Sequence, residues 1–190
     1  MDEAVQQRRA IDHVNSTMDN GFQGIEANIG TDGVLDLRPE EAAAFDLVLA
    51  APHSRLRKKD DQTRRLVTAV ENPQVRILAH PRGRMSGSRA GVVADWALVF
   101  ATAAEGAVAI EIDGDPARQD LDYAMAREAL EANCLFALDS DAHTTTQLSY
   151  AETALAHARL AGIPADRIVN CWPLDRFLTW LAEPAGERRS

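Results

Sequence analysis

The chain has 190 residues, of which 46% are hydrophobic and 26% are charged, so its composition is that of a soluble globular protein and excludes a disordered one. The formal net charge of −9 argues against broad, nonspecific binding to nucleic acid. No apolar run approaches the roughly 20 residues that a membrane helix needs, so we expect no membrane partner. The acidic start of the chain shows no signal peptide, and Cys134 and Cys171 lie far apart, which predicts a cytoplasmic protein with reduced thiols.

Helical and extended patterns alternate along the chain. Apolar spacing and turn residues predict helices over residues 3–18, 61–71, 91–105, 121–132 and 173–181. Pro39 opens a further short helix, and a helix capped at residues 144–146 ends before Gly162. Short apolar runs predict strands over residues 24–29, 46–53, 75–80, 107–113 and 135–138, with extended pieces at 34–37 and 167–171.

Alternation of strands and helices predicts βαβ units, and therefore an α/β fold with a parallel sheet or barrel. Residues 107–113 are so continuously apolar that both faces of that strand should be covered. Nothing in the sequence marks a repeat, a linker or a low-complexity segment. We therefore expect one domain over residues 1–183, followed by a frayed tail over residues 184–190.

Side chains that bind metals recur where these strands end. Glu26 lies in the first strand, His53 and His80 end the next two, and Asp141 and His143 follow the fifth. In a βα barrel the functional groups gather at the carboxyl ends of the strands. Two imidazoles and a carboxylate suit Zn, Mn or Fe and leave a position for water, which the metal activates at neutral pH. The pattern predicts a divalent metal site with hydrolytic chemistry.

These residues also have simpler interpretations. A single histidine at a strand end is more often a hydrogen-bonded loop residue, whereas Glu26 inside an apolar strand is costly to bury without a partner. Asp139 is a further candidate ligand. Arg82, Arg84 and Arg118 are candidate anion partners because guanidinium matches phosphate oxygens, and for Arg84 and Arg118 a salt bridge that shapes the loop is an equal alternative. A local basic entry to the site could come from Arg55, Arg57, Lys58 and Lys59.

Short motifs accompany the strand ends, and two of them are His80-Pro81-Arg82-Gly83-Arg84 and Asp141-Ala142-His143. Further motifs lie at residues 24–29, 32–33, 35–36, 46–54, 72–73, 111–113 and 169–170. Together they resemble the PHP (polymerase and histidinol phosphatase) superfamily of metal-dependent phosphoesterases, in particular the PHP domain of bacterial family X DNA polymerases and stand-alone PHP phosphoesterases. The resemblance covers residues 24–181 and implies a distorted (β/α)7 barrel. It also implies that Glu26 bridges two metal ions, that His53 and His80 complete the second, that Asp141 binds the first, and that His143 binds a third.

The sequence departs from the family at its beginning. Relatives start with a strand that carries a His-x-His pair, followed by an Asp, and a second strand that ends in His. This sequence has none of these residues, so the resemblance implies a PHP barrel that lacks about its first two strands and holds fewer than three metal ions. Asp113 also stands where relatives usually have asparagine. Unpaired strand edges would favour self-association.

Two functions of different classes follow. The first is a phosphoesterase that uses metal-activated water to hydrolyse a phosphomonoester or a nucleic-acid 3′ end, with Arg84 and Arg118 as catalytic candidates; its partner is then a small phosphorylated substrate or a nucleic-acid end. The alternative is a catalytically impaired remnant that binds a metal or a partner without turnover. Amidohydrolase-like chemistry, a third interpretation, lacks its usual strand lysine, because Lys58 and Lys59 lie in a predicted loop.

Overall fold

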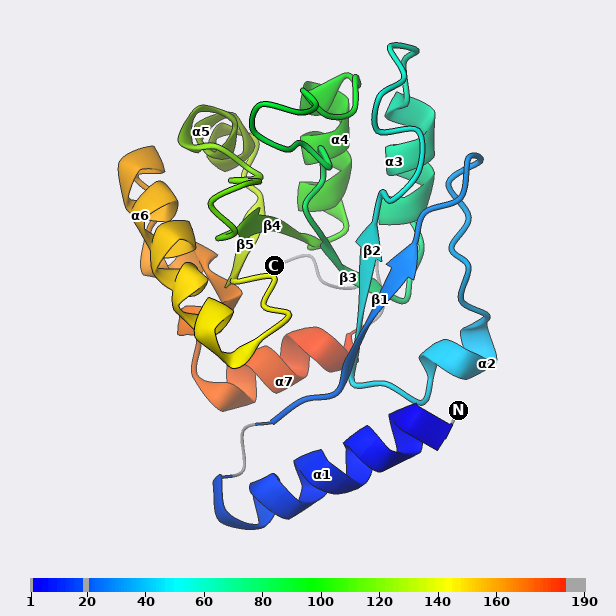
Figure 1. Ribbon diagram of the computed structural model, residues 1–190, viewed down its shortest axis with the longest axis vertical. Helices are drawn as coiled ribbons and strands as arrows, with labels where there is room; N and C mark the ends of the chain where they lie inside the picture. The colour runs from blue at the N-terminus through cyan, green and yellow to red at the C-terminus, as the bar shows by residue number, and fades with distance from the viewer. Residues whose placement is uncertain (1, 19–20, 184–190) are drawn as a thin grey trace.

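Five parallel strands form one sheet in the part of the chain that the structure, a computed structural model, describes, which is residues 2–18 and 21–183. Their order across the sheet is their order in the chain (Figure 1). The strands are β1 (Gly24–Asn28), β2 (Leu47–Ala51), β3 (Val75–Leu78), β4 (Ala109–Asp113) and β5 (Leu135–Asp139). Because all five run in the same direction, their carboxyl ends lie along one edge of the sheet.

Helices cover the sheet on both faces, and α3, α4, α5 and α6 pack on one face while α7 packs on the other (Figure 1). The helices are α1 (Asp2–Met18), α2 (Pro39–Ala42), α3 (Thr63–Val70), α4 (Trp96–Glu105), α5 (Tyr123–Glu131), α6 (Ala151–Ala161) and α7 (Leu174–Ala182). Three short 3-10 helices complete the chain: η1 (Thr145–Tyr150), η2 (Ala165–Arg167) and η3 (Val169–Cys171). The α/β class with a parallel sheet is as predicted, and the arrangement is consistent with part of a barrel.

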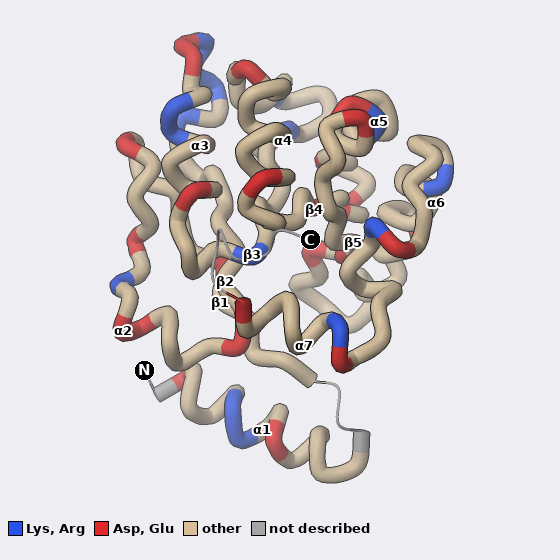
Figure 2. The backbone as a smooth tube through the Cα atoms, turned by 180° about the vertical axis from the view of Figure 1, so that it is seen from behind, with Lys and Arg blue, Asp and Glu red and all other residues tan. Residues whose placement is uncertain are grey.

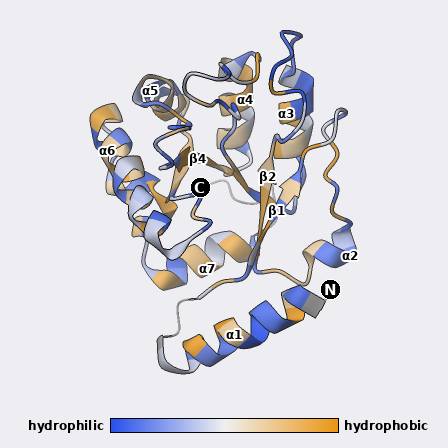
Figure 3. Cartoon of the chain, in the orientation of Figure 1, coloured by the Kyte–Doolittle hydropathy of each residue, from blue (hydrophilic) through white to orange (hydrophobic). Residues whose placement is uncertain are grey.

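The alternation of side chains along β3 shows how the two cores form. Leu78 packs into the large core with Leu66 of α3 and Phe100 of α4, whereas Ile77 points to the opposite face and packs with Trp180 of α7. Every residue of β4 is buried, which confirms that both faces of this strand are covered. The strands accordingly stand out as hydrophobic segments in Figure 3.

Helix α1 lies across the bottom of the molecule in Figure 1, away from the carboxyl ends of the strands. Polar contacts tie it to the start of the sheet: Gln23 Nε2 donates to the Ala4 carbonyl at 2.8 Å, and Arg8 Nη1 pairs with Asp46 Oδ2 at 2.9 Å. The long N-terminal helix was predicted, but its position could not be.

Three local predictions are wrong. Residues 91–95 are not helical: Asp95 has extended dihedrals and accepts the Leu98 N–H at 3.1 Å, so it caps α4. The helix expected from residues 144–146 begins as η1, and α6 itself starts only at Ala151. Of the extended segment expected over residues 167–171, only Ile168 is extended, with a parallel β-bridge to Phe136; the residues on either side of it belong to the 3-10 helices η2 and η3.

A side chain explains the last of these differences. The Asn170 amide bonds the backbone of Leu138 on both sides, accepting its N–H at 2.8 Å and donating to its carbonyl at 3.0 Å. These are the bonds that a neighbouring strand would make, so the edge of β5 is satisfied there without a further strand.

None of the helices in the described residues is both long and apolar enough to cross a membrane. The predicted tail, residues 184–190, lies outside the described residues.

Candidate metal centre

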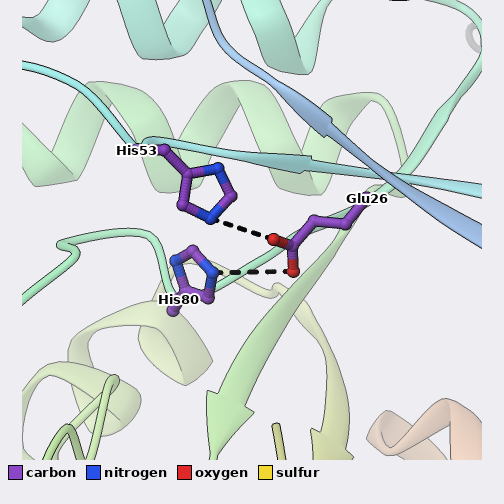
Figure 4. A group of neighbouring side chains, drawn as sticks. All are labelled: Glu26, His53 and His80. Atoms are coloured by element: carbon purple, nitrogen blue, oxygen red, sulfur yellow. Dashed lines mark ion pairs between the residues drawn. The ribbon is translucent and has the colours of Figure 1, made fainter. Parts of the chain in front are cut away.

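Three side chains from the first three strands and the loops that follow them meet at one point (Figure 4). Glu26 belongs to β1, whereas His53 and His80 each stand two positions after the last residue of β2 and β3. His53 Nε2 lies 3.0 Å from Glu26 Oε1, and His80 Nε2 lies 3.5 Å from Glu26 Oε2. One ligand atom from each residue lies within 4.8 Å of the other two. The structure therefore brings together residues that the sequence separates by more than fifty positions.

Electrostatics ties the three groups to one another. The hydrogen bond with His80 lowers the pKa of the Glu26 carboxyl in spite of its partial burial, so this group is ionised at neutral pH. Burial lowers the pKa of His53, and the charge of Glu26 offsets part of that effect. Burial, the largest single effect on His80, disfavours its charged form, but the hydrogen bond to Glu26 and the charges of Glu26 and Asp120 together outweigh it and raise the pKa of His80.

This donor set fits a divalent cation. One carboxylate and two imidazole nitrogens are ligands that Zn, Mn and Fe accept. The side chains of Glu26 and His53 are 37% and 40% exposed, so water reaches the point where the ligand atoms converge. His80 is only 2% exposed, and its Nδ1 is buried without a hydrogen-bond partner among the described residues. Three protein ligands with one side open to solvent are typical of a catalytic site, not a closed structural one.

Arg118 lies beside this cluster, between two carboxylates. Its Nε is 3.1 Å from Asp141 Oδ2 and 3.6 Å from Asp113 Oδ2. Burial raises the pKa of Asp113 to about 7, and the charges of neighbouring aspartates add to the shift. The charges of Arg118 and Asp141 both act on His53. Arg118 and Asp141 are therefore neighbours of the cluster, with Asp141 paired to the guanidinium.

Two other predicted site residues lie differently. The His143 side chain is 74% exposed, and its Nδ1 lies 2.7 Å from the carbonyl oxygen of Asp141. Arg84 and Arg82 each place Nη1 on the same oxygen of Asp122, at 3.0 and 3.3 Å. For Arg84 the structure thus shows the loop-shaping salt bridge that was one of its two interpretations.

The loop between β2 and α3 carries the Lys and Arg residues that were predicted to form a basic entry to the site (Figure 2). One of them, Arg57, joins this loop to the next by donating to the Ser88 carbonyl at 2.8 Å and to its hydroxyl at 3.0 Å.

The sequence assigned no role to Glu111 of β4, which positions the backbone of His80 by a hydrogen bond. Its Oε2 accepts the backbone N–H of His80 at 2.5 Å, and its carboxyl group also bonds Asp139. Burial, followed by the charge of Asp139, raises the pKa of Glu111 well above its usual range, which favours its protonated form. The sequence did contain a signal for this role, because Glu111 is an acidic residue inside a strand predicted to be covered on both faces. A buried carboxylate without a partner is costly, so such a residue is expected to have a hydrogen-bonding partner.

Comparison with known proteins gives three informative relatives. The DNA polymerase/3'-5' exonuclease PolX of Bacillus subtilis is 32% identical over 87% of this chain and 30% of its own length. A probable phosphatase of Shewanella sediminis is 31% identical over 85% of this chain and 67% of its own length. A probable phosphatase of a Thermoanaerobacter species is 28% identical over 78% of this chain and 63% of its own length. No family model matches the chain.

A parallel α/β sheet that gathers imidazole and carboxylate groups at the carboxyl ends of its strands defines an α/β protein with a candidate metal centre. With the relatives above, the assignment can be made more specific. The chain belongs to the PHP superfamily. It spans about a third of the polymerase and about two thirds of the phosphatases that it matches.

Proposed function

We propose that this chain is a phosphoesterase that depends on a divalent cation (Zn, Mn or Fe) held by Glu26, His53 and His80, and that it hydrolyses a phosphomonoester or a nucleic-acid 3′ end. The observation that carries the proposal is the convergence of these three side chains at the carboxyl edge of the sheet. The relatives support it, since their names describe phosphatases and a polymerase with exonuclease activity.

Each protein group has a definite task in this proposal. Ionised Glu26 supplies negative charge, and the two imidazoles present Nε2 to the same point. When bound, the cation supplies Lewis-acid character, which polarises a phosphoryl oxygen and acidifies a water molecule. Arg118, whose positive charge acts on Glu26, holds the phosphoryl oxygens by its guanidinium.

The remaining predicted residues have supporting roles in the proposal. Asp141 is a second-ion ligand candidate once Arg118 turns toward substrate, because the two are paired at 3.1 Å. His143 stands on the exposed rim, and Arg84 would have to leave Asp122 to reach a phosphate. We therefore rank Arg118 above Arg84 as the anion partner.

One observation favours the second candidate function, a catalytically impaired PHP remnant that binds a metal or a partner. Arg118 is neutralised by Asp113 and Asp141, so the charge it offers a substrate is reduced.

A barrel without about its first two strands would also present the edge of β1, which is the ground for proposing self-association. Size-exclusion chromatography with light scattering tests that part: a monomer at all concentrations would contradict it.

The two functions separate in one experiment. The purified chain is analysed for bound metal and assayed with p-nitrophenyl phosphate in Mn²⁺, together with His80→Ala and, as a matched control, His13→Ala on exposed α1. A phosphoesterase loses metal and activity in His80→Ala only. Bound metal without turnover in the unsubstituted chain supports the remnant, and neither metal nor turnover contradicts both.

A further inference from the structure

His53 is the last member of a chain of hydrogen bonds that begins outside the cluster. Its Nδ1 lies 2.5 Å from Asn28 Oδ1, on the side of the ring opposite Glu26. The amide nitrogen of Asn28 in turn donates to Asp36 Oδ2, and the backbone N–H of Asn28 donates to Asp36 Oδ1 at 2.8 Å. Both oxygens of Asp36 are thus used on one residue.

The direction of every bond in this chain follows from chemistry. An ionised carboxylate only accepts hydrogen bonds, so the group that Asn28 turns toward Asp36 must be its NH₂. The amide oxygen must then face His53. Because that oxygen only accepts, the ring nitrogen opposite it must carry the hydrogen. Glu26 Oε1 competes for the ring proton from the Nε2 side at 3.0 Å, and the Asn28 contact, the shorter of the two at 2.5 Å, favours the proton on Nδ1. A neutral His53 held in this way has its lone pair on Nε2, which is the atom at the cluster.

We propose that Asp36 and Asn28 are positioning residues that lock His53 in the Nδ1–H tautomer and thereby direct the Nε2 lone pair at the cation site. The inference deepens the proposed function and rests on it for the identity of the ligand. Histidines that bind metals gain basicity and a fixed ring orientation from such a partner on the second nitrogen. In metal-ligand pairs this partner is a carboxylate or a carbonyl; here an amide passes the effect of a carboxylate to the ring.

The fold delivers Asp36 to this place through a tight turn. After β1 the chain reverses over residues 30–34, with Gly30 N–H bonded to the Val34 carbonyl at 2.7 Å and a β-bridge between Ile29 and Leu35. The Asp36 N–H then bonds the Asn28 carbonyl at 3.1 Å. Asp36 and Asn28 are therefore joined by three hydrogen bonds, and the carboxylate has a defined position before any ligand binds.

The test reads the tautomer first and the affinity second. In the ¹⁵N-labelled full chain at about pH 8, where the lowered pKa keeps His53 neutral, long-range proton–nitrogen NMR distinguishes a protonated Nδ1 from a protonated Nε2. The His53→Gln variant assigns the signals. We expect Nδ1–H in the unsubstituted chain and a mixture of tautomers in Asp36→Asn and Asn28→Ala.

Zn²⁺ affinity is then measured by calorimetry. Loss of a residue in this position typically costs 10–100-fold in affinity, and we expect a loss of about that size in Asp36→Asn. The control is Asp32→Asn, which removes the same charge from the same turn; among the described residues, the Asp32 carboxylate accepts a hydrogen bond only from the Val34 N–H. The double variant Asn28→Asp with Asp36→Asn exchanges the two groups and keeps every donor opposite an acceptor, so it should restore both readouts.

The outcomes separate the inference from the function. An Nε2–H tautomer in the unsubstituted chain, or equal losses of affinity in Asp36→Asn and Asp32→Asn, overturns the positioning role. If the chain binds no Zn²⁺ but the tautomer changes in Asp36→Asn as expected, the result contradicts the metal-dependent function. It still supports the inference that Asp36 and Asn28 set the tautomer of His53. Thermal unfolding of each variant confirms that the chain under test is folded.

Discussion

Arg65 of α3 donates two hydrogen bonds to Ser54, from Nη1 to the carbonyl and from Nη2 to the hydroxyl, at 2.9 Å each. The same guanidinium donates from Nε to the Gly30 carbonyl at 2.8 Å and from Nη2 to the Ile29 carbonyl at 2.5 Å. Because Ser54 follows His53 directly, one buried side chain joins the loops after β1 and β2 that carry the candidate site. The arginine is 4% exposed and works through neutral acceptors.

Replacing this side chain by lysine should destabilise the protein. Arg65→Lys keeps the charge but has three donors where the guanidinium has five, so buried carbonyls lose their partners. We expect a loss of about 2–4 kcal/mol in the free energy of unfolding, measured by urea denaturation. The neighbouring exposed Arg64→Lys should change stability by less than about 0.5 kcal/mol, and an equal effect of both substitutions would contradict the role of Arg65.

Gly33 should tolerate no side chain, because it closes the turn that delivers Asp36. Its φ is +90°, and an added Cβ would lie 2.6 Å from both the Arg65 carbonyl oxygen and Thr68 Cβ. Gly87 is the matched control, since its φ is +70° but an added Cβ meets nothing within 4 Å. Gly87→Ala should cost about 1 kcal/mol from backbone strain alone, and Gly33→Ala about 1–3 kcal/mol more from overpacking. Equal shifts of the urea midpoint in Gly33→Ala and Gly87→Ala would show that the turn rearranges to accommodate the added methyl group.

Glu111 should be replaceable by glutamine but not by leucine. The amide of Glu111→Gln can accept the His80 N–H and donate to Asp139, as the neutral acid does. Glu111→Leu leaves the buried His80 N–H without an acceptor, which costs about 1–3 kcal/mol. Urea unfolding of the two variants measures the difference, and a leucine variant as stable as the glutamine variant would remove this support from the site.

The two thiols should differ sharply in reactivity. Cys134 is buried, its Sγ donates to the Phe100 carbonyl at 3.2 Å, and burial raises its pKa to about 12, whereas Cys171 is exposed. At about pH 8 a disulfide reagent such as DTNB should react quickly with one thiol in the native protein and with both after unfolding. Cys171→Ser should abolish the fast reaction; a fast phase that survives this substitution would place Cys134 within reach of solvent.

Much of the secondary structure could be predicted from local sequence patterns. Apolar runs bounded by turn residues indicated all five strands, because a strand covered on both faces must be continuously apolar. The same local patterns missed the start of α4 at Trp96, where a cap decides the boundary. They also missed the turns on either side of Ile168, where the Asn170 side chain takes the place of a longer strand.

The sequence by itself placed Glu26 within the first of three successive strands and His53 and His80 at the ends of the next two, since strand ends follow from hydrophobic runs and parallel βαβ units bring those ends to one edge. Only the tertiary structure decided that their ligand atoms converge, that Arg118 pairs with Asp141 beside them, and that Arg84 pairs with Asp122. It alone also revealed the support that Asp36, Arg65 and Glu111 provide. Such contacts depend on hydrogen bonds between residues distant in the chain, and these leave no period or spacing in the sequence from which they could be read.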